Sequence, residues 1–63
     1  MKEANEFVGM GKRPAQNLAE SKGYIFRLVS VDGEQVLGYP EDQRDDRVCV
    51  EVVATKVVKA VIR

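Results

Sequence analysis

A charged run that leads straight into an apolar strand constrains this chain most. Six of the seven residues from Glu41 to Arg47 are charged, and both signs are present. Such a segment is too polar for a core, and because it lacks glycine it does not suit a tight two-residue hairpin turn. The alternating residues of Val48–Val53 then predict a half-buried strand. We therefore expect an exposed loop, rooted beside a strand, whose arginines hold it extended by pairing with its own carboxylates and carbonyls.

Length and composition exclude most kinds of catalytic site. The chain has 63 residues, enough for one domain, and a domain of this size buries only about 60% of its unfolded surface. The sequence has no histidine and a single cysteine, Cys49. An internal disulfide, the usual zinc ligand sets and the Cys/His or Ser/His/Asp catalytic groups are therefore excluded. We expect no enzyme activity, no bound metal and no cofactor.

Charge and hydropathy also bear on partners and location. Ten basic and ten acidic side chains balance to a formal net charge of zero, which gives no overall attraction to nucleic acid or to an anionic membrane. No apolar stretch approaches the roughly 18 residues of a membrane span, and the first residues lack the apolar core of a secretion signal. A free thiol suits a reducing compartment. We expect a cytoplasmic protein, or a secreted one if a signal peptide has been removed, with no nucleic-acid or membrane partner.

The first part of the chain predicts a short tail and one helix. We expect residues 1–6 to form a flexible N-terminal tail and residues 7–63 to form a single domain. Over Lys12–Lys22 the apolar residues recur at helical spacing, with Pro14 in the first turn and Gly23 as a stop signal. A helix of about ten residues is marginal alone, so it must pack against an apolar surface.

Three segments predict strands, which makes the expected fold class α+β. β-Branched and aromatic residues indicate a strand over Tyr24–Val31, and Asp32–Gly33 then supplies a turn signal. The alternating strand that begins at Val48 is followed by a last strand over Val57–Ile62. We expect this last strand at a sheet edge, because neighbouring cationic residues protect an edge from pairing with other chains. The result is one short helix packed on a small sheet, with a long exposed loop between strands.

Several short motifs follow one another at set spacings from the beginning of the domain to its end. In chain order they are Phe7-Val8-Gly9, Ala15 six positions after that glycine, Gly23-Tyr24, Arg27-Leu28-Val29-Ser30-Val31-Asp32-Gly33, and Pro40-Glu41-Asp42-Gln43-Arg44-Asp45-Asp46-Arg47-Val48. Together they resemble the potato inhibitor I family of serine protease inhibitors, most closely its small bacterial members. The loop there is typically Thr-Met-Asp-Tyr-Arg-Pro-Asp-Arg-Leu. The resemblance implies a helix on a small mixed sheet, in which two parallel strands are joined by the inhibitory loop.

The resemblance also implies which residues meet a protease and which support the loop. The protease-binding residues are Tyr39, Pro40, Glu41, Asp42, Gln43 and Arg44, and the supporting residues are Arg44, Asp46 and Arg47. The scissile bond is then expected between Glu41 and Asp42, with Arg44 and Arg47 holding Asp42 by charge-assisted hydrogen bonds. Bracing of this kind reduces the entropy lost on binding and keeps the ends of a cleaved bond together. Because Glu41 would then enter the specificity pocket, we expect the target to be a serine protease that prefers glutamate.

Two positions depart from the family pattern. Pro40 stands where the family has a threonine, and Cys49 stands where plant members have a further loop-supporting arginine. A register shifted by two residues would offer Tyr39 to a chymotrypsin-like pocket. Pro40 would then follow the scissile bond, where most serine proteases tolerate it poorly, so we keep Glu41.

Other interpretations stay open at the level of sequence. The charged run is also consistent with a solvated loop held by ordinary surface ion pairs of about 0–1 kcal/mol each. A non-inhibitory interaction module of the same fold, monomeric or weakly homodimeric through the Val57–Ile62 edge, is the second functional hypothesis. Cys49 is expected to be a small strand residue, with redox chemistry or an intermolecular disulfide as the alternative.

Overall fold

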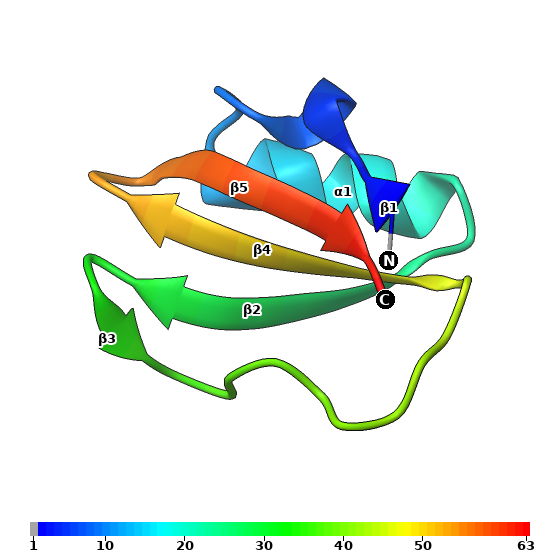
Figure 1. Ribbon diagram of the computed structural model, residues 1–63. Helices are drawn as coiled ribbons and strands as arrows, with labels where there is room; N and C mark the ends of the chain where they lie inside the picture. Colours follow the sequence, from blue (N-terminus) through cyan, green and yellow to red (C-terminus); the bar gives the residue numbers. More distant parts are fainter. Residues whose placement is uncertain (1) are drawn as a thin grey trace.

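A short helix lies across one face of a mixed β-sheet in the computed structural model, which describes residues 2–63 (Figure 1). Within these residues the elements are β1 (Lys2–Glu3), the 3₁₀ turn η1 (Asn5–Phe7), α1 (Lys12–Ser21), β2 (Ile25–Val31), β3 (Glu34–Gln35), β4 (Arg47–Val53) and β5 (Lys56–Ile62). The strands of the sheet lie in the order β1-β5-β4-β2-β3. β2 and β4 pair in parallel and the other neighbours pair antiparallel. The predicted α+β class is confirmed.

The helix begins and ends where its sequence signals lie. Gly11 precedes it in an extended conformation, Pro14 stands in its first turn, and Gly23 follows it with a φ of +81°. Ala15 and Ala19 have no exposed surface, and these small side chains let the helix axis approach the sheet closely. The helix predicted over Lys12–Lys22 is thereby confirmed to within one residue.

Alternation along β4 divides the core between the two faces of the sheet. Val48, Val50 and Val52 point toward the helix, where they join a main core that also holds Phe7. Cys49 points to the opposite face. On that face it forms a small second cluster with Val29 and Val61, against which Tyr39 packs. The predicted half-buried strand therefore has both of its faces covered, one by the helix and one by the loop.

The N-terminal residues belong to the fold, whereas the sequence predicts a flexible tail over residues 1–6. Met1 lies outside the described residues, but Lys2 and Glu3 pair with Ile62 and Val61 of β5. Ala4 is buried and donates its N–H to the carbonyl of Ala60 at 2.9 Å. The reason for the difference is the burial of Phe7, which brings the preceding residues onto the sheet.

The same segment removes β5 from the edge position predicted for Val57–Ile62. Besides the pairing with β1, Gly9 donates its N–H to the Val57 carbonyl and Val57 donates its N–H to the Met10 carbonyl, both at 2.8 Å. The edge prediction is therefore wrong, because backbone groups from the N-terminal segment pair with the outer side of β5. The cationic residues Lys56 and Lys59 are exposed side chains of this covered strand and do not protect a free edge.

Two tight turns meet at the C-terminal end of β2. Asp32 and Gly33 both have positive φ, +51° and +83°, which confirms the predicted turn and reverses the chain into the short strand β3, which the sequence did not predict. Ala54 and Thr55 form the turn between β4 and β5, also with positive φ. The Asp32 carboxylate accepts the Ala54 N–H at 2.8 Å and so joins the two turns.

Replacing Phe7 tests whether the N-terminal segment is part of the core. Phe7→Ala should lower the free energy of unfolding by about 3–5 kcal/mol, since it removes a fully buried aromatic ring. A chain of this size has a total stability of only about 0.05–0.15 kcal/mol per residue, so the variant should be largely unfolded in urea titrations. The neighbouring Val8, 44% exposed, supplies the control Val8→Ala with little effect. Equal stability of the Phe7 variant and the native protein would contradict the arrangement.

Candidate functional site

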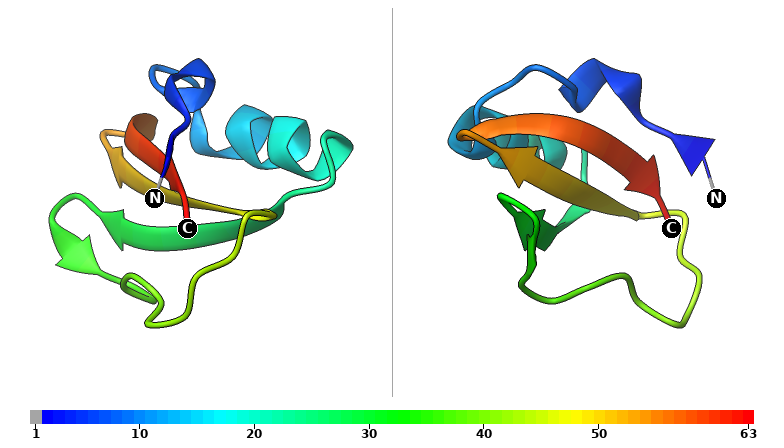
Figure 2. Two further views of the ribbon diagram at one scale, coloured as in Figure 1. Left: turned by 45° about the vertical axis from the view of Figure 1, so that its right-hand side comes forward. Right: turned by 60° about the vertical axis from the view of Figure 1, so that its left-hand side comes forward.

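The connection from β2 to β4 crosses the face of the sheet that the helix leaves free. Because the two strands are parallel, the chain must return from the end of one to the beginning of the other, and α1 precedes both strands, so it takes no part in this crossover. The return is made by the loop of residues 36–46, which runs below the sheet in Figure 2 while α1 lies above it. The packing of Tyr39 against Cys49 places the loop on that free face.

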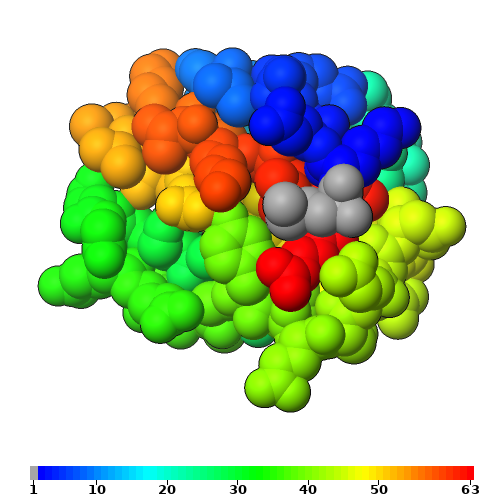
Figure 3. All heavy atoms as spheres, viewed as in Figure 1, coloured from blue at the N-terminus to red at the C-terminus, as the bar shows by residue number. Residues whose placement is uncertain are grey.

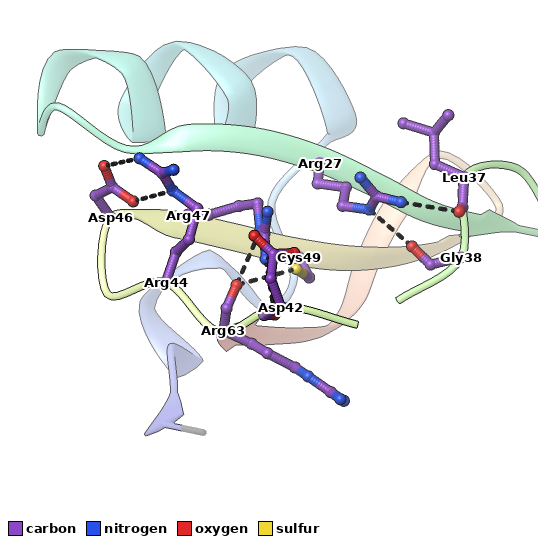
Figure 4. Close-up of polar contacts among 9 residues, drawn as sticks. All are labelled: Arg27, Leu37, Gly38, Asp42, Arg44, Asp46, Arg47, Cys49 and Arg63. Carbon is purple, nitrogen blue, oxygen red and sulfur yellow. Dashed lines mark hydrogen bonds and ion pairs between the residues drawn. The ribbon is translucent and has the colours of Figure 1, made fainter. Parts of the chain in front are cut away.

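The first part of the loop is tied to β2. Val36 and Gly38 both donate their N–H groups to the Val29 carbonyl, at 2.8 and 3.2 Å. In the opposite direction, Arg27 of β2 donates from Nε to the Gly38 carbonyl at 2.8 Å and from Nη2 to the Leu37 carbonyl at 3.0 Å (Figure 4). Contacts in both directions fix this segment to the strand that it leaves.

Tyr39 and Pro40 anchor the middle of the loop against the sheet. Two cationic groups lie near the Tyr39 ring, the Nζ of Lys59 at 5.9 Å from the ring centroid and the guanidinium of Arg63 at 5.7 Å. Its hydroxyl donates to the Glu51 carboxylate. Burial, followed by this bond to a carboxylate, raises the pKa of Tyr39 above its usual value. Pro40 is buried and Tyr39 is partly buried, so these two expected protease-binding residues pack against the fold.

The tip of the loop is the part that solvent reaches. Glu41, Asp42, Gln43 and Arg44 are all exposed, as is Asp45. The yellow-green segment that they form projects from the body of the molecule in Figure 3. The ion pairs among residues 2–63 are Lys22–Glu6, Arg44–Asp46 and Arg47–Asp42, so the Glu41 carboxylate takes part in none of them.

Arg47 connects the tip of the loop to the sheet and to the C-terminal residue. Only 8% of Arg47 is exposed. Its Nη2 donates to the Asp42 carbonyl at 3.1 Å and to the Asp42 carboxylate at 3.2 Å, and its Nε donates to the Arg63 carbonyl at 2.9 Å (Figure 4). The hydrogen bond from Arg47 is the main reason that the pKa of Asp42 lies below its usual value. The expected support of Asp42 by Arg47 is therefore present.

Arg44 does not give the support expected of it. Its guanidinium donates from Nε and Nη2 to the two carboxylate oxygens of Asp46, at 2.7 and 2.8 Å. Asp46 is only two residues away in the chain, so a bidentate pair forms locally and Arg44 turns away from Asp42. Both side chains are nearly half exposed, and solvent weakens such pairs. The pair lowers the pKa of Asp46 but does not join the loop to the sheet.

Sequence reasoning missed the supports at the start of the loop. Arg27 is the one charged residue of Ile25–Val31, and that isolation is the signal that the sequence offers. Gly38, with a φ of +71°, makes the bend that turns two successive carbonyls toward Arg27. A Cβ at this position would lie 2.7 Å from the Gln35 side chain. The partnership of Tyr39 with Glu51 had no signal in the sequence, because the two residues meet only across the sheet.

Chemically, this site offers a tethered peptide and acidic side chains. No group of three or more His, Cys, Asp or Glu side chains within residues 2–63 is placed to hold a metal ion. The carbonyls of residues 37, 38 and 42 accept hydrogen bonds from arginines that lie in strands. These contacts hold the loop in one conformation, in which another molecule could bind it.

Comparisons with protein-family models, with curated proteins and with solved structures found no match to this chain. No helix in residues 2–63 is long and apolar enough to cross a membrane. The functional argument therefore depends on the geometry of the loop.

Replacing the two loop arginines should have unequal effects. Arg47→Ala should lower the free energy of unfolding by about 1.5–3 kcal/mol, the contribution of hydrogen bonds to a charged group, since it removes a nearly buried guanidinium with three acceptors. Arg44→Ala should have a much smaller effect, because its pair with Asp46 is exposed. Urea unfolding of both variants measures the difference. Equal losses would contradict the assignment of Arg47 as the main support.

Asp42 should report the contact with Arg47 through its titration. The pKa of Asp42 in the folded protein lies below the ordinary 3.8. The contact between the ionised Asp42 carboxylate and Arg47 therefore stabilises the fold fully above pH 3.8, and this stabilisation is lost as the pH falls through the pKa of the folded state. Carboxyl chemical shifts in NMR titrations should show a higher pKa for Asp42 in Arg47→Ala than in the native protein. The low pKa of Asp46, which depends mainly on Arg44, is the internal control. An unchanged Asp42 titration would mean that the contact is absent in solution.

Proposed function

We propose that this protein is a serine protease inhibitor that presents the Glu41–Asp42 peptide bond on its braced loop. One observation carries the proposal. A nearly buried guanidinium, that of Arg47, binds both the carbonyl and the carboxylate of Asp42, the residue that follows the proposed scissile bond. An ordinary solvated loop has no need for an arginine that is taken out of water to hold its backbone, because isolated buried charge is costly.

The way that the loop is attached supports inhibition over simple cleavage. Residues before the proposed bond are tied to β2, and Asp42 after it is tied to Arg47 at the start of β4. β2 and β4 are hydrogen-bonded neighbours, with Ile25 opposite Arg47. After cleavage, both new ends would therefore remain attached to adjacent strands of one sheet. When a protease serine attacks the Glu41 carbonyl, the leaving amine of Asp42 would stay close because Arg47 holds that residue. The amine could then attack the acyl-enzyme and reform the peptide bond.

Preorganisation explains how such a small contact could bind tightly. A flexible peptide loses conformational entropy when a protease holds it extended, whereas a loop that is already extended loses less. The anchors at Tyr39 and Pro40 and the support from Arg47 restrict the chain on both sides of Glu41 before any partner arrives. The helix on a mixed sheet, with parallel strands joined by an exposed loop, agrees with the potato inhibitor I resemblance of the sequence.

The exposed Glu41 side chain points to the class of protease. In the proposed complex it would enter the pocket that selects the residue before the scissile bond. A carboxylate without a partner in an apolar or anionic pocket carries a large desolvation cost. We therefore propose a serine protease with a cationic, glutamate-preferring pocket as the partner.

The non-inhibitory alternative has less structural support. A homodimer formed by edge pairing would use the strand Val57–Ile62. The outer side of that strand is already occupied, because Lys2 pairs with it and the N–H groups of Ala4 and Gly9 donate to its carbonyls. The dimer would have to displace these contacts first. The inhibitor proposal uses the loop as it stands.

An inhibition assay with a glutamate-preferring serine protease tests the function. Native protein should slow hydrolysis of a glutamyl chromogenic substrate competitively, and Glu41→Ala should weaken inhibition by about thirty-fold or more, as expected for a central contact residue. Glu34→Ala removes an exposed carboxylate from β3 and should leave inhibition unchanged. Mass spectrometry should find slow cleavage, and only between residues 41 and 42.

Two results would contradict the proposal. The first is full protease activity at micromolar concentrations of native, folded protein across several glutamate-preferring serine proteases. The second is equal weakening of inhibition by the Glu41 and Glu34 variants, which would show that the contact surface is elsewhere.

A further inference from the structure

We infer that Arg27 is a second positioning residue of the loop, which fixes the segment before the Glu41–Asp42 bond as Arg47 fixes the segment after it. The inference rests on the proposed function for its consequence in inhibition. The bracing itself is a structural claim and can be tested without a protease.

The surroundings of Arg27 in β2 do not explain the presence of a charged side chain there. It is the one ionisable residue of Ile25–Val31, and its register partner in the parallel pair is Cys49, which lies in the small core on the loop face. Arg27 is half-buried, and no carboxylate is paired with it among the ion pairs of residues 2–63. Its hydrogen-bonding groups are directed instead to the backbone of the loop.

The geometry of the contact fixes direction as well as distance. Nε and Nη2 of one planar guanidinium meet two successive carbonyls, those of Gly38 and Leu37, at 2.8 and 3.0 Å. A planar fork with two fixed donors restrains the orientation of the peptide units that it binds, which a single ammonium cannot do. Because Gly38 also donates its N–H to the Val29 carbonyl, both of its backbone polar groups are bound by β2.

The restraint is passed directly to the proposed contact residues. Tyr39 and Pro40 follow Gly38 and are packed on the sheet, and Glu41 comes next. A partner that binds the segment before a scissile bond as an extended strand forms hydrogen bonds with the backbone of this segment. Along the chain, Glu41 therefore lies between Gly38, which is bound by Arg27 of β2, and Asp42, which is bound by Arg47 of β4. Figure 4 shows these two sets of contacts.

Amide hydrogen exchange on three variants of the 63-residue chain tests the bracing. Arg27→Met keeps the length and the apolar stem but removes all donors. It should raise exchange of the Val36 and Gly38 amides, which donate to the Val29 carbonyl, by about tenfold, the effect of losing charge-assisted hydrogen bonds nearby. Exchange in Arg47–Val53 of β4 should not change. Arg27→Lys keeps a charge and one donor group without the fork, so its exchange should lie between those of the methionine variant and the native protein. Arg13→Met, on the exposed surface of α1, is the matched control and should change nothing.

Protease cleavage gives the second readout. With a glutamate-preferring serine protease, the Glu41–Asp42 bond should be cut faster in Arg27→Met than in the native protein, while Arg27→Lys restores part of the resistance. If the methionine variant does not fold, the lysine variant still tests the fork, because it retains the stem and the charge. Unchanged exchange in the loop, or a uniform rise in the loop and β4 alike, would overturn the inference. A selective rise in a protein that binds no protease would support the bracing and overturn the inhibitor function alone.

Discussion

The parallel pairing of β2 and β4 is the constraint on which the rest of this small structure depends. Parallel neighbours cannot be joined by a tight turn, and the crossover between them is most often a helix. Here the single α-helix described in residues 2–63 precedes both strands and covers one face of the sheet. The crossover must then pass over the other face as irregular chain. The backbone carbonyls of such a segment are not paired in a regular helix or sheet, so side chains from the strands have to donate hydrogen bonds to them.

Two arginines in the strands donate these hydrogen bonds to backbone carbonyl oxygens. Arg27 binds the carbonyls of residues 37 and 38, and Arg47 binds those of residues 42 and 63. Several fixed donors on one planar group suit this purpose, because one side chain can satisfy two otherwise unpaired carbonyls. Arg44, by contrast, lies on the loop itself and binds its near neighbour Asp46. Whether an arginine supports a loop thus depends on where its backbone is rooted.

The sequence was informative wherever local chemistry decides the structure. Helical spacing between Pro14 and Gly23, alternation after Arg47 and the Asp32–Gly33 turn were each predicted and are each present. The pairing of Arg47 with Asp42 was predicted from the resemblance. These features depend on residues close together in the chain or on a recognised order of motifs.

What escaped prediction depends on contacts between distant residues. The supposed tail pairs with the last strand because Phe7 fills the core, and that pairing covers the edge assigned to Val57–Ile62. Arg27 and Gly38 meet only after the chain has reversed through β3. No periodicity in the sequence encodes such meetings, since they arise from the way that the strands are ordered in space.

The thiol of Cys49 has a use that follows from its place beneath the loop. It has no exposed surface, and the partly buried Tyr39 ring packs against its cluster from the solvent side. A reagent that alkylates thiols can therefore reach the sulfur only in molecules where the residues packed around it, Tyr39 among them, have moved apart. Since the sequence contains no other cysteine, the rate of labelling reports how often the cluster beneath the crossover opens, without any added probe.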